Sequence, residues 1–278
     1  MNLESHAPSI LILGAGVTGA SLARAAVSRG LSVVLVDVDQ RALDRAQADF
    51  LRAGLSRQVA AGLLRTGRSV QDGAGAGLVI EAVTEKAVVK TKALTAACQV
   101  VAPGTALVSC SLAIPVDEIA DWAGRPQDVV GAHFTHPAFP ATAVEYARGP
   151  RTADAAVAAL GGLARSLGLA LIEVRDGPGL LGTRVCYQMI NSAARALESG
   201  LGRAESIDGV LCECFGHTVG PLRAADLIGI DSLVNTLQEI YNRTGEETCN
   251  PCELLLDKVR AGELGRKSGR GFYTYDKV

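Results

Sequence analysis

The sequence predicts an α/β fold, in which a Rossmann-type doubly wound parallel sheet is followed by an all-α C-terminal domain. Short apolar runs alternate with helical patterns from Ser9 to Val174, as expected for a sheet that helices cover on both faces. After Asp176-Gly-Pro-Gly179 the strand signal disappears, and the remaining segments all have helical patterns. We therefore expect a domain boundary near residue 176, which separates residues 1–176 from residues 177–278.

The first strand–helix–strand unit contains a glycine-rich turn. An apolar run from Ser9 is followed by Gly14-Ala-Gly-Val-Thr-Gly19, a helical stretch to Arg29, and a second apolar run that ends at Asp37. In such a unit the first glycine permits a tight turn, the second admits a pyrophosphate, and the third lets the helix approach the sheet. The helix N-terminus directs free N–H groups at the phosphates. A carboxylate at Asp37 suits ribose hydroxyls and repels a 2′-phosphate, so we predict NAD rather than NADP. The alternative is an ordinary βαβ unit with a tight turn.

Further elements follow from the apolar periodicity. Short apolar runs predict four more strands, at Leu78–Ala82, Ala106–Ser109, Val129–His133 and Ala170–Val174, and an extended segment at Thr142–Tyr146. Helices are expected at Arg41–Leu64, Ala87–Val100, Val116–Trp122, Ala153–Leu167, Leu180–Gly200, Glu205–Phe215, Pro221–Asn242 and Pro251–Ala261.

Composition narrows the function classes. The 278 residues, 48% of them hydrophobic, suffice for one large or two modest domains. A net charge of −2 does not favour nucleic acid or a membrane as a partner. The first eight residues lack an apolar secretory segment and the seven cysteines are dispersed, so we expect a cytoplasmic protein. Cys212-x-Cys214 and Cys249-x-x-Cys252 lack histidines at metal-finger spacing, and we expect no metal site.

Chemistry is expected beyond the carboxyl ends of the strands, where ligands of open α/β sheets bind. Four stretches fall there: Glu81–Glu85 with Lys90, Ser109–Leu112, His133–Pro137 and Val174–Gly179. Histidine titrates near neutrality and suits proton transfer, and a carboxylate on its second ring nitrogen fixes the tautomer. His133 and Glu145 could form such a pair. The alternative is that a histidine which ends a strand has only a structural role.

Motifs along nearly the whole chain support a family resemblance. They are Gly14–Gly19, Val36-Asp37, Val79–Glu85, Gly131–Pro137, Asp176–Gly179, Gly220–Asp231 and Leu264–Tyr273. On these motifs the chain resembles the short-chain L-3-hydroxyacyl-CoA dehydrogenases, including the bacterial 3-hydroxybutyryl-CoA dehydrogenases, over about residues 8–275.

The resemblance implies reversible hydride transfer between NAD and C3 of a 3-hydroxyacyl thioester, with His133 taking the hydroxyl proton and Glu145 pairing with it. It also implies a homodimer through the helical domain, for which we expect a face formed by Pro221–Asp231 with Leu233, Leu237 and Ile240. An internal core stripe is the alternative for these residues, and the two interpretations are not exclusive. Cofactor contacts are implied for Gly14, Gly16, Val17, Thr18, Gly19, Asp37, Glu85, Lys90, Cys110, His136 and Lys267.

Four polar positions depart from the family pattern. The family usually has Ser-Asn-Thr-Ser-Ser-Leu where this chain has Ser109-Cys-Ser-Leu-Ala-Ile114, which puts Leu112 at the catalytic serine and Cys110 at a cofactor-side asparagine. His136 and Thr183 also replace asparagines of the family. Candidate replacements for the lost donors are Ser111, Thr183 and His136.

These departures leave the substrate open. The polar and basic residues with which the family contacts CoA are not reproduced near residues 52–61. The substrate can therefore equally be a thioester of an acyl carrier protein or of CoA. Relatives of the family act on carrier-linked groups in polyketide extender-unit biosynthesis. We expect an NAD-dependent dehydrogenase. The alternatives are a diverged enzyme of a non-redox step, such as dehydration or cyclisation, and a non-catalytic NAD-binding protein.

Overall fold

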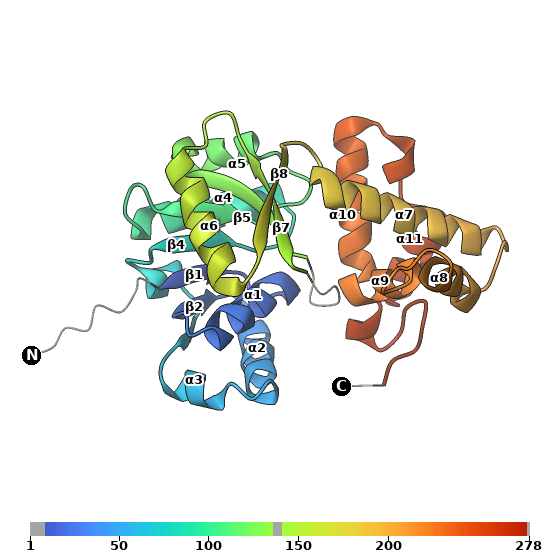
Figure 1. Cartoon of the computed structure of the whole chain (residues 1–278), viewed down its shortest axis with the longest axis horizontal. Coiled ribbons are helices and arrows are strands. Elements are labelled where there is room, and N and C mark those ends of the chain that lie inside the picture. Colours follow the sequence, from blue (N-terminus) through green and yellow to red (C-terminus); the bar gives the residue numbers. More distant parts are fainter. Residues whose placement is uncertain (1–8, 136–140, 277–278) are drawn as a thin grey trace, which may run out of the picture. The chain divides into compact units, whose positions relative to one another are not determined.

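The chain folds into two compact units (Figure 1). The structure is a computed structural model that describes residues 9–135 and 141–276. By their internal contacts, the chain up to Phe134 and the segment Ala141–Gly177 form the first unit, and Thr135 belongs with the chain from Pro178 onward to the second. All the strands of the described sheet belong to the first unit, and the second is built from helices. The predicted fold class is therefore confirmed.

The first unit contains one sheet of eight described strands. Their bounds are β1 Ile10–Leu13, β2 Val33–Val36, β3 Leu64–Gly67, β4 Leu78–Glu81, β5 Ala106–Ser109, β6 Val129–His133, β7 Ala143–Arg148 and β8 Ala170–Arg175. The strand order is β3-β2-β1-β4-β5-β6-β7-β8, and β1 to β6 are all parallel. The order reverses between β1 and β4, which is where ligands of doubly wound sheets bind.

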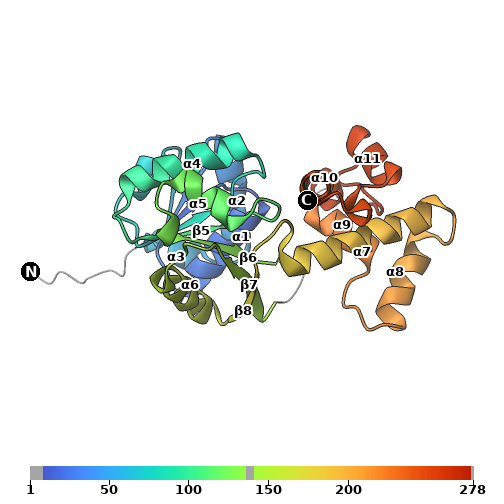
Figure 2. The same cartoon turned by 90° about the horizontal axis from the view of Figure 1, so that it is seen from above.

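Helices cover both faces of this sheet (Figure 2). On one face α1 (Val17–Ser28) and α6 (Asp154–Leu167) pack together, and on the other α4 (Ala87–Val100) packs with α5 (Val116–Ala123). Every residue of β1 is therefore buried. This two-sided burial explains why the central strands read as continuous apolar runs rather than as alternating patterns.

The single helix predicted for Arg41–Leu64 is wrong. The structure has α2 (Gln40–Arg52), a short α3 (Ser56–Ala60) and the strand β3 in this region. Gly54 and Gly62 have φ of +76° and +77°, a conformation that ends each helix. Only Leu64 of β3 is buried, so this edge strand has no apolar run that a sequence pattern could reveal. The strand β3 forms because it pairs with β2.

The predicted position of Val174–Gly179 at the ligand-binding edge is also wrong. β7 is antiparallel to β6, with Glu145 opposite His133, and β8 is parallel to β7. The last two strands therefore run against the first six, and β8 ends at the edge away from His133. Asp176 there accepts a hydrogen bond of 2.9 Å from the N–H of Val116, at the start of α5.

The second unit is helical in its described residues. Its helices are α7 Leu180–Glu198, α8 Ala204–Glu213, α9 Pro221–Ile228, α10 Ile230–Thr244 and α11 Glu253–Arg260. The continuous helix predicted for Pro221–Asn242 is wrong, because Gly229 has φ +98° and separates α9 from α10. None of the described helices is long and apolar enough to cross a membrane.

The three apolar residues predicted for a dimer face on α10 are buried. Leu233, Leu237 and Ile240 are fully buried within this unit, so they form the internal core stripe that was the alternative. Apolar side chains need water-free contact, and these three obtain it from their own unit. A homodimer through the second unit stays a prediction.

The C-terminal motif has a structural explanation. Asp226 of α9 accepts hydrogen bonds from the N–H groups of Phe272 and Tyr273 and from the hydroxyl of Tyr275. A Cβ on Gly271 would lie 2.0 Å from a carboxylate oxygen of Asp226, so only glycine fits there. Burial raises the pKa of Asp226 although these donors oppose the rise. The motif therefore fastens the chain end to α9.

Candidate active site at the carboxyl edge of the sheet

The glycine-rich turn after β1 has one glycine that faces open space. A Cβ on Gly14 (φ +100°) would lie 2.6 Å from the carbonyl oxygen of Ala82, and a Cβ on Gly19 would lie 1.9 Å from that of Gly14. Gly16 has nothing within 4 Å of the corresponding position. Packing therefore requires the first and third glycines, whereas the second leaves the space into which a pyrophosphate fits.

Polar groups line this space. The N–H groups of Val17 and Thr18 meet no acceptor among the described residues, and the helix begins with the bond from the Ala20 N–H to the Gly16 carbonyl. Asp37, at the end of β2, accepts the N–H groups of Ala15 at 2.7 Å and Asp39 at 2.9 Å. These residues fit a dinucleotide, since free N–H groups can bind phosphate and the fixed carboxylate can bind ribose.

His133 and Glu145 are brought together by the reversed strand β7. They are directly paired across β6 and β7, and the His133 Nδ1 lies 3.4 Å from the Glu145 Oε2. Their side chains are mostly buried, at 16% and 13% exposure. Because β6 is parallel to β1, His133 lies at the same edge of the sheet as the glycine-rich turn.

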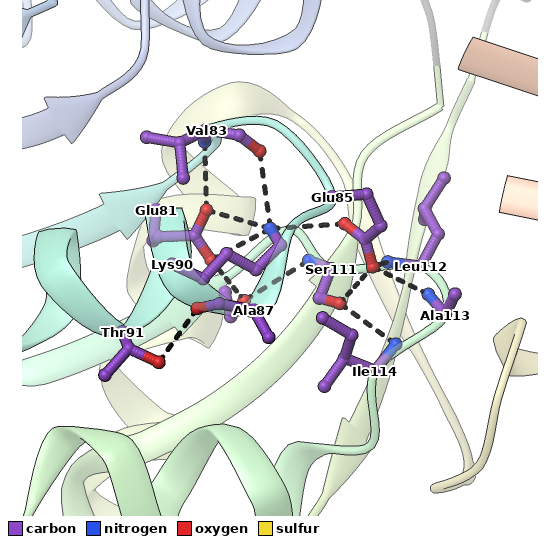
Figure 3. Close-up of polar contacts among 11 residues, drawn as sticks. Glu81, Val83, Glu85, Ala87, Lys90, Thr91, Ser111, Leu112, Ala113 and Ile114 are labelled. Carbon is purple, nitrogen blue, oxygen red and sulfur yellow. Dashed lines mark hydrogen bonds and ion pairs between the residues drawn. The ribbon is translucent and has the colours of Figure 1, made fainter. Parts of the chain in front are cut away.

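A buried ion-pair network lies between these two places (Figure 3). The Lys90 ammonium lies 2.9 Å from Glu81 Oε1 and 3.2 Å from Glu85 Oε2. The side chains of Lys90 and Glu81 are 1% and 0% exposed. Burial alone lowers the pKa of Lys90, but the two carboxylates outweigh it and the pKa is raised. This geometry does not favour the predicted contact between Lys90 and the cofactor, and it assigns the ammonium to the two carboxylates.

Glu85 fastens the loop that follows β5. One of its carboxylate oxygens accepts the Ser111 hydroxyl, the Leu112 N–H at 3.0 Å and the Ala113 N–H at 2.9 Å. Burial alone raises the pKa of Glu85, but Lys90 and these donors outweigh it and the pKa is lowered. Glu85 is therefore held as a carboxylate that anchors the loop.

We call residues Cys110–Ile114 the β5 loop, and all its backbone N–H groups are engaged. Besides the two N–H groups on Glu85, Cys110 donates to the Glu81 carbonyl, Ser111 to the Ser109 hydroxyl, and Ile114 to the Ser111 hydroxyl. Ser111 donates its own hydrogen to Glu85. This geometry does not favour Ser111 as a replacement for the missing catalytic serine, because no hydrogen remains for a substrate.

The remaining predicted residues are placed as follows. Cys110 is partly buried, and burial first and Glu81 second raise the pKa of its thiol, so it stays protonated. Thr183 is buried in α7, and Lys267 pairs with Asp231, both in the second unit. His136 lies outside the described residues. Within the described part of the chain, no cluster of three or more His, Cys, Asp or Glu side chains could hold a metal.

Glu81 and Ser109 lie in stretches that were predicted at this edge, but the sequence assigned neither residue a role. Glu81 ends an apolar strand, and its carboxylate accepts from Lys90, from the Val83 N–H and from the Ser109 hydroxyl. A charged residue within a continuous apolar run is a signal of a buried partner, because an unpaired buried charge is very unfavourable. The spacing alone could not show that this partner is Lys90.

Comparison with known proteins shows the family. Residues 9–177 match the NAD-binding domain of 3-hydroxyacyl-CoA dehydrogenase, and residues 179–275 match the C-terminal domain of that enzyme. The chain belongs to the 3-hydroxyacyl-CoA dehydrogenase family. It is an NAD-dependent oxidoreductase, which confirms the predicted resemblance and cofactor.

The similarity extends over the full length of this dehydrogenase and of its relatives. The chain is 33% identical over 280 residues to a probable 3-hydroxybutyryl-CoA dehydrogenase of Bacillus subtilis, covering 96% of this chain and 97% of that protein. The crystal structure of FadB2 from Mycobacterium tuberculosis matches with a TM-score of 0.87 and 30% identity, over 98% of this chain and 100% of that one. (S)-3-hydroxybutyryl-CoA dehydrogenase PaaH1 of Ralstonia eutropha matches with a TM-score of 0.81 and 31% identity, over 97% and 99%.

Proposed function

We propose that this dehydrogenase oxidises the 3-hydroxyl group of a 3-hydroxyacyl thioester with NAD, and that His133 is the general base. The observation that supports this proposal is the pairing of His133 with Glu145 at the edge where the glycine-rich turn opens. The names of the relatives, which are 3-hydroxybutyryl-CoA dehydrogenases, support the substrate class.

The geometry of the pair suits proton transfer. Glu145 faces Nδ1, which favours the tautomer that carries its hydrogen there and leaves the lone pair of Nε2 to accept the hydroxyl proton. The carboxylate then stabilises the imidazolium that forms. NAD, held by the glycine-rich turn and Asp37, would supply the acceptor for the hydride of C3. In the reverse direction His133 returns the proton to the oxygen of the substrate.

The β5 loop contributes shape rather than hydrogen bonds in this mechanism. Its backbone donors are all engaged, and Leu112 stands where the family has its serine. A single preorganised donor is worth ~100- to 1000-fold in rate. We propose that His133 is the main polar contact of the substrate hydroxyl in the first unit, and that Leu112 selects for an apolar group beside it.

The first experiment tests both the reaction and the carrier of the acyl group. The purified protein is mixed with NAD and 3-hydroxyacyl thioesters linked either to CoA or to an acyl carrier protein, and absorbance at 340 nm is followed. We expect NAD reduction with at least one of these thioesters. Products are weighed by mass spectrometry, because loss of two hydrogens supports oxidation. Loss of water, or no product at all, contradicts the proposal and supports the non-redox or non-catalytic alternatives.

His133→Ala tests the general base. We expect a loss of about 100- to 10,000-fold in kcat, the range that a positioned acid–base group supplies, with little change in the Kd of NADH. Glu145→Gln is expected to lose less, because the imidazole remains. His217→Ala is the matched control, since this histidine lies in the second unit between α8 and α9. Equal activity of His133→Ala and the control would show that another group moves the proton.

We further propose a homodimer formed through the second unit. Its support is an open groove of about 430 Å³ lined mostly by small and apolar side chains of α7 and α8 and by the exposed Leu201. Light scattering at micromolar concentration is expected to give twice the mass of one chain. A mass of one chain would contradict this proposal.

A further inference from the structure

A basic side chain stands beside the acid that ends β2. Arg68 directly follows β3, and the last residue of that strand, Gly67, accepts the N–H of Asp37 at 3.1 Å. The Arg68 guanidinium donates to the carbonyl oxygen of Val38 at 3.2 Å. The Arg68 guanidinium is therefore held at Val38, the residue after Asp37. Arg68 lies on the β3 side of Asp37, and the glycine-rich turn lies on the β1 side.

This cation has donors to spare. Within the described residues Arg68 forms no ion pair with a carboxylate, and the bond to Val38 uses one of its five N–H groups. The nearby acids are engaged elsewhere: Asp37 accepts two backbone N–H groups, and Asp39 caps α2 by accepting the Arg41 N–H. The guanidinium is thus available to an anion.

The Arg68 guanidinium lies where the 2′ position of the adenosine ribose is expected. In dinucleotide-binding folds the acid after the second strand contacts the 2′-hydroxyl of the adenosine ribose, and a nearby arginine accommodates a 2′-phosphate. Val38 exposes 81% of its surface between the two charged residues and offers an apolar face to adenine. Asp37 and Arg68 therefore bracket the 2′ position with opposite charges.

We propose that Arg68 is a ready-made 2′-phosphate site and that the Asp37 carboxylate alone keeps this dehydrogenase selective for NAD. The carboxylate repels a 2′-phosphate and occupies its place. Without that charge, the guanidinium binds the phosphate through charge-assisted hydrogen bonds. Cofactor choice in this chain thus depends on one residue rather than on a remodelled pocket.

Binding of reduced cofactors tests the proposal without turnover. The Kd values of NADPH and NADH are measured from nicotinamide fluorescence, and the readout is their ratio in each variant. In Asp37→Asn the ratio of the NADPH Kd to the NADH Kd is expected to fall at least about tenfold, the lower end of what a hydrogen bond to a charged group contributes. Asp37→Asn/Arg68→Gln is expected to lose this gain. Asp37→Asn/Arg41→Gln is the matched control and keeps it.

Three results would overturn the proposal. They are an unchanged ratio in Asp37→Asn, a gain that survives Arg68→Gln, and a gain that Arg41→Gln abolishes. Thermal unfolding shows whether each variant is folded, and Asp37→Ser replaces Asp37→Asn if the latter is not. Because the readout is binding, a failure here is distinct from a failure of the proposed hydride transfer.

Discussion

The glycine-rich turn and the β5 loop both follow central parallel strands at one edge of the sheet, yet they use their backbones in opposite ways. In the turn, Gly16 faces open space and the N–H groups of Val17 and Thr18 meet no acceptor among the described residues. In the β5 loop all five backbone N–H groups already have acceptors within the protein.

This difference gives the two segments different roles: the glycine-rich turn can bind a ligand, whereas the β5 loop can only position its own side chains. Unused N–H groups at a helix start can bind an anion, whereas N–H groups already bonded to a buried carboxylate can only hold their own loop in place. The turn is therefore built for the phosphates of the cofactor. The β5 loop, fixed by Glu85, presents side chains such as Leu112 in a set position.

The largest expected effect is a difference in stability between substitutions at two glycines of the turn. Gly19→Ala places a Cβ 1.9 Å from the Gly14 carbonyl oxygen, so we expect a loss of about 3 kcal/mol or more in the free energy of unfolding. Gly16→Ala has open space and is expected to fold normally, but its methyl group fills the pyrophosphate space and weakens NADH binding about tenfold. Urea unfolding and fluorescence titration measure the two effects. Similar stability of both variants would contradict the different roles assigned to these glycines.

The next effect concerns the anchor of the β5 loop. Glu85→Ala leaves three loop donors without their acceptor and is expected to cost about 2–3 kcal/mol of unfolding free energy, since each buried unpaired donor is unfavourable. Glu85→Gln retains one acceptor oxygen, so its loss is expected to be smaller. Amide hydrogen exchange is expected to rise at Leu112 and Ala113 in Glu85→Ala. Unchanged exchange there would show that the loop does not depend on this carboxylate.

The smallest effect is the pH dependence of the same anchor. The pKa of Glu85 lies below its ordinary value of 4.5, so its contribution to stability is present above that pH and is lost as pH falls through the lowered pKa. The pKa of Lys90 lies above 10.5, so its contribution is present below that pH and is lost at higher pH. The wild type is therefore expected to lose more stability than Glu85→Gln between pH 5 and pH 3. Parallel curves for the two proteins would contradict the lowered pKa.

Sequence patterns were informative where the backbone itself carries the signal. The glycine-rich turn, the buried strands and Asp37 are local features, because turn geometry and two-sided burial restrict residue types at each position. The pattern failed for β3, whose residues are mostly exposed, and for the helix that Gly229 interrupts. It placed Glu81 at the right edge but did not show its pairing with Lys90, because a buried charge is explained only by a partner that lies elsewhere in the chain.

The sequence by itself determined that this protein has a dinucleotide-binding sheet, a helical C-terminal domain and a histidine, His133, at the end of a buried strand. Only the tertiary structure decided that the last two strands run backwards, which sets Glu145 opposite His133, and that Arg68 lies beside Asp37. The physical reason is the range of the interactions. Turns and periodic burial act over a few residues, whereas strand direction, buried ion pairs and the engagement of N–H groups depend on segments that meet only after the chain has folded.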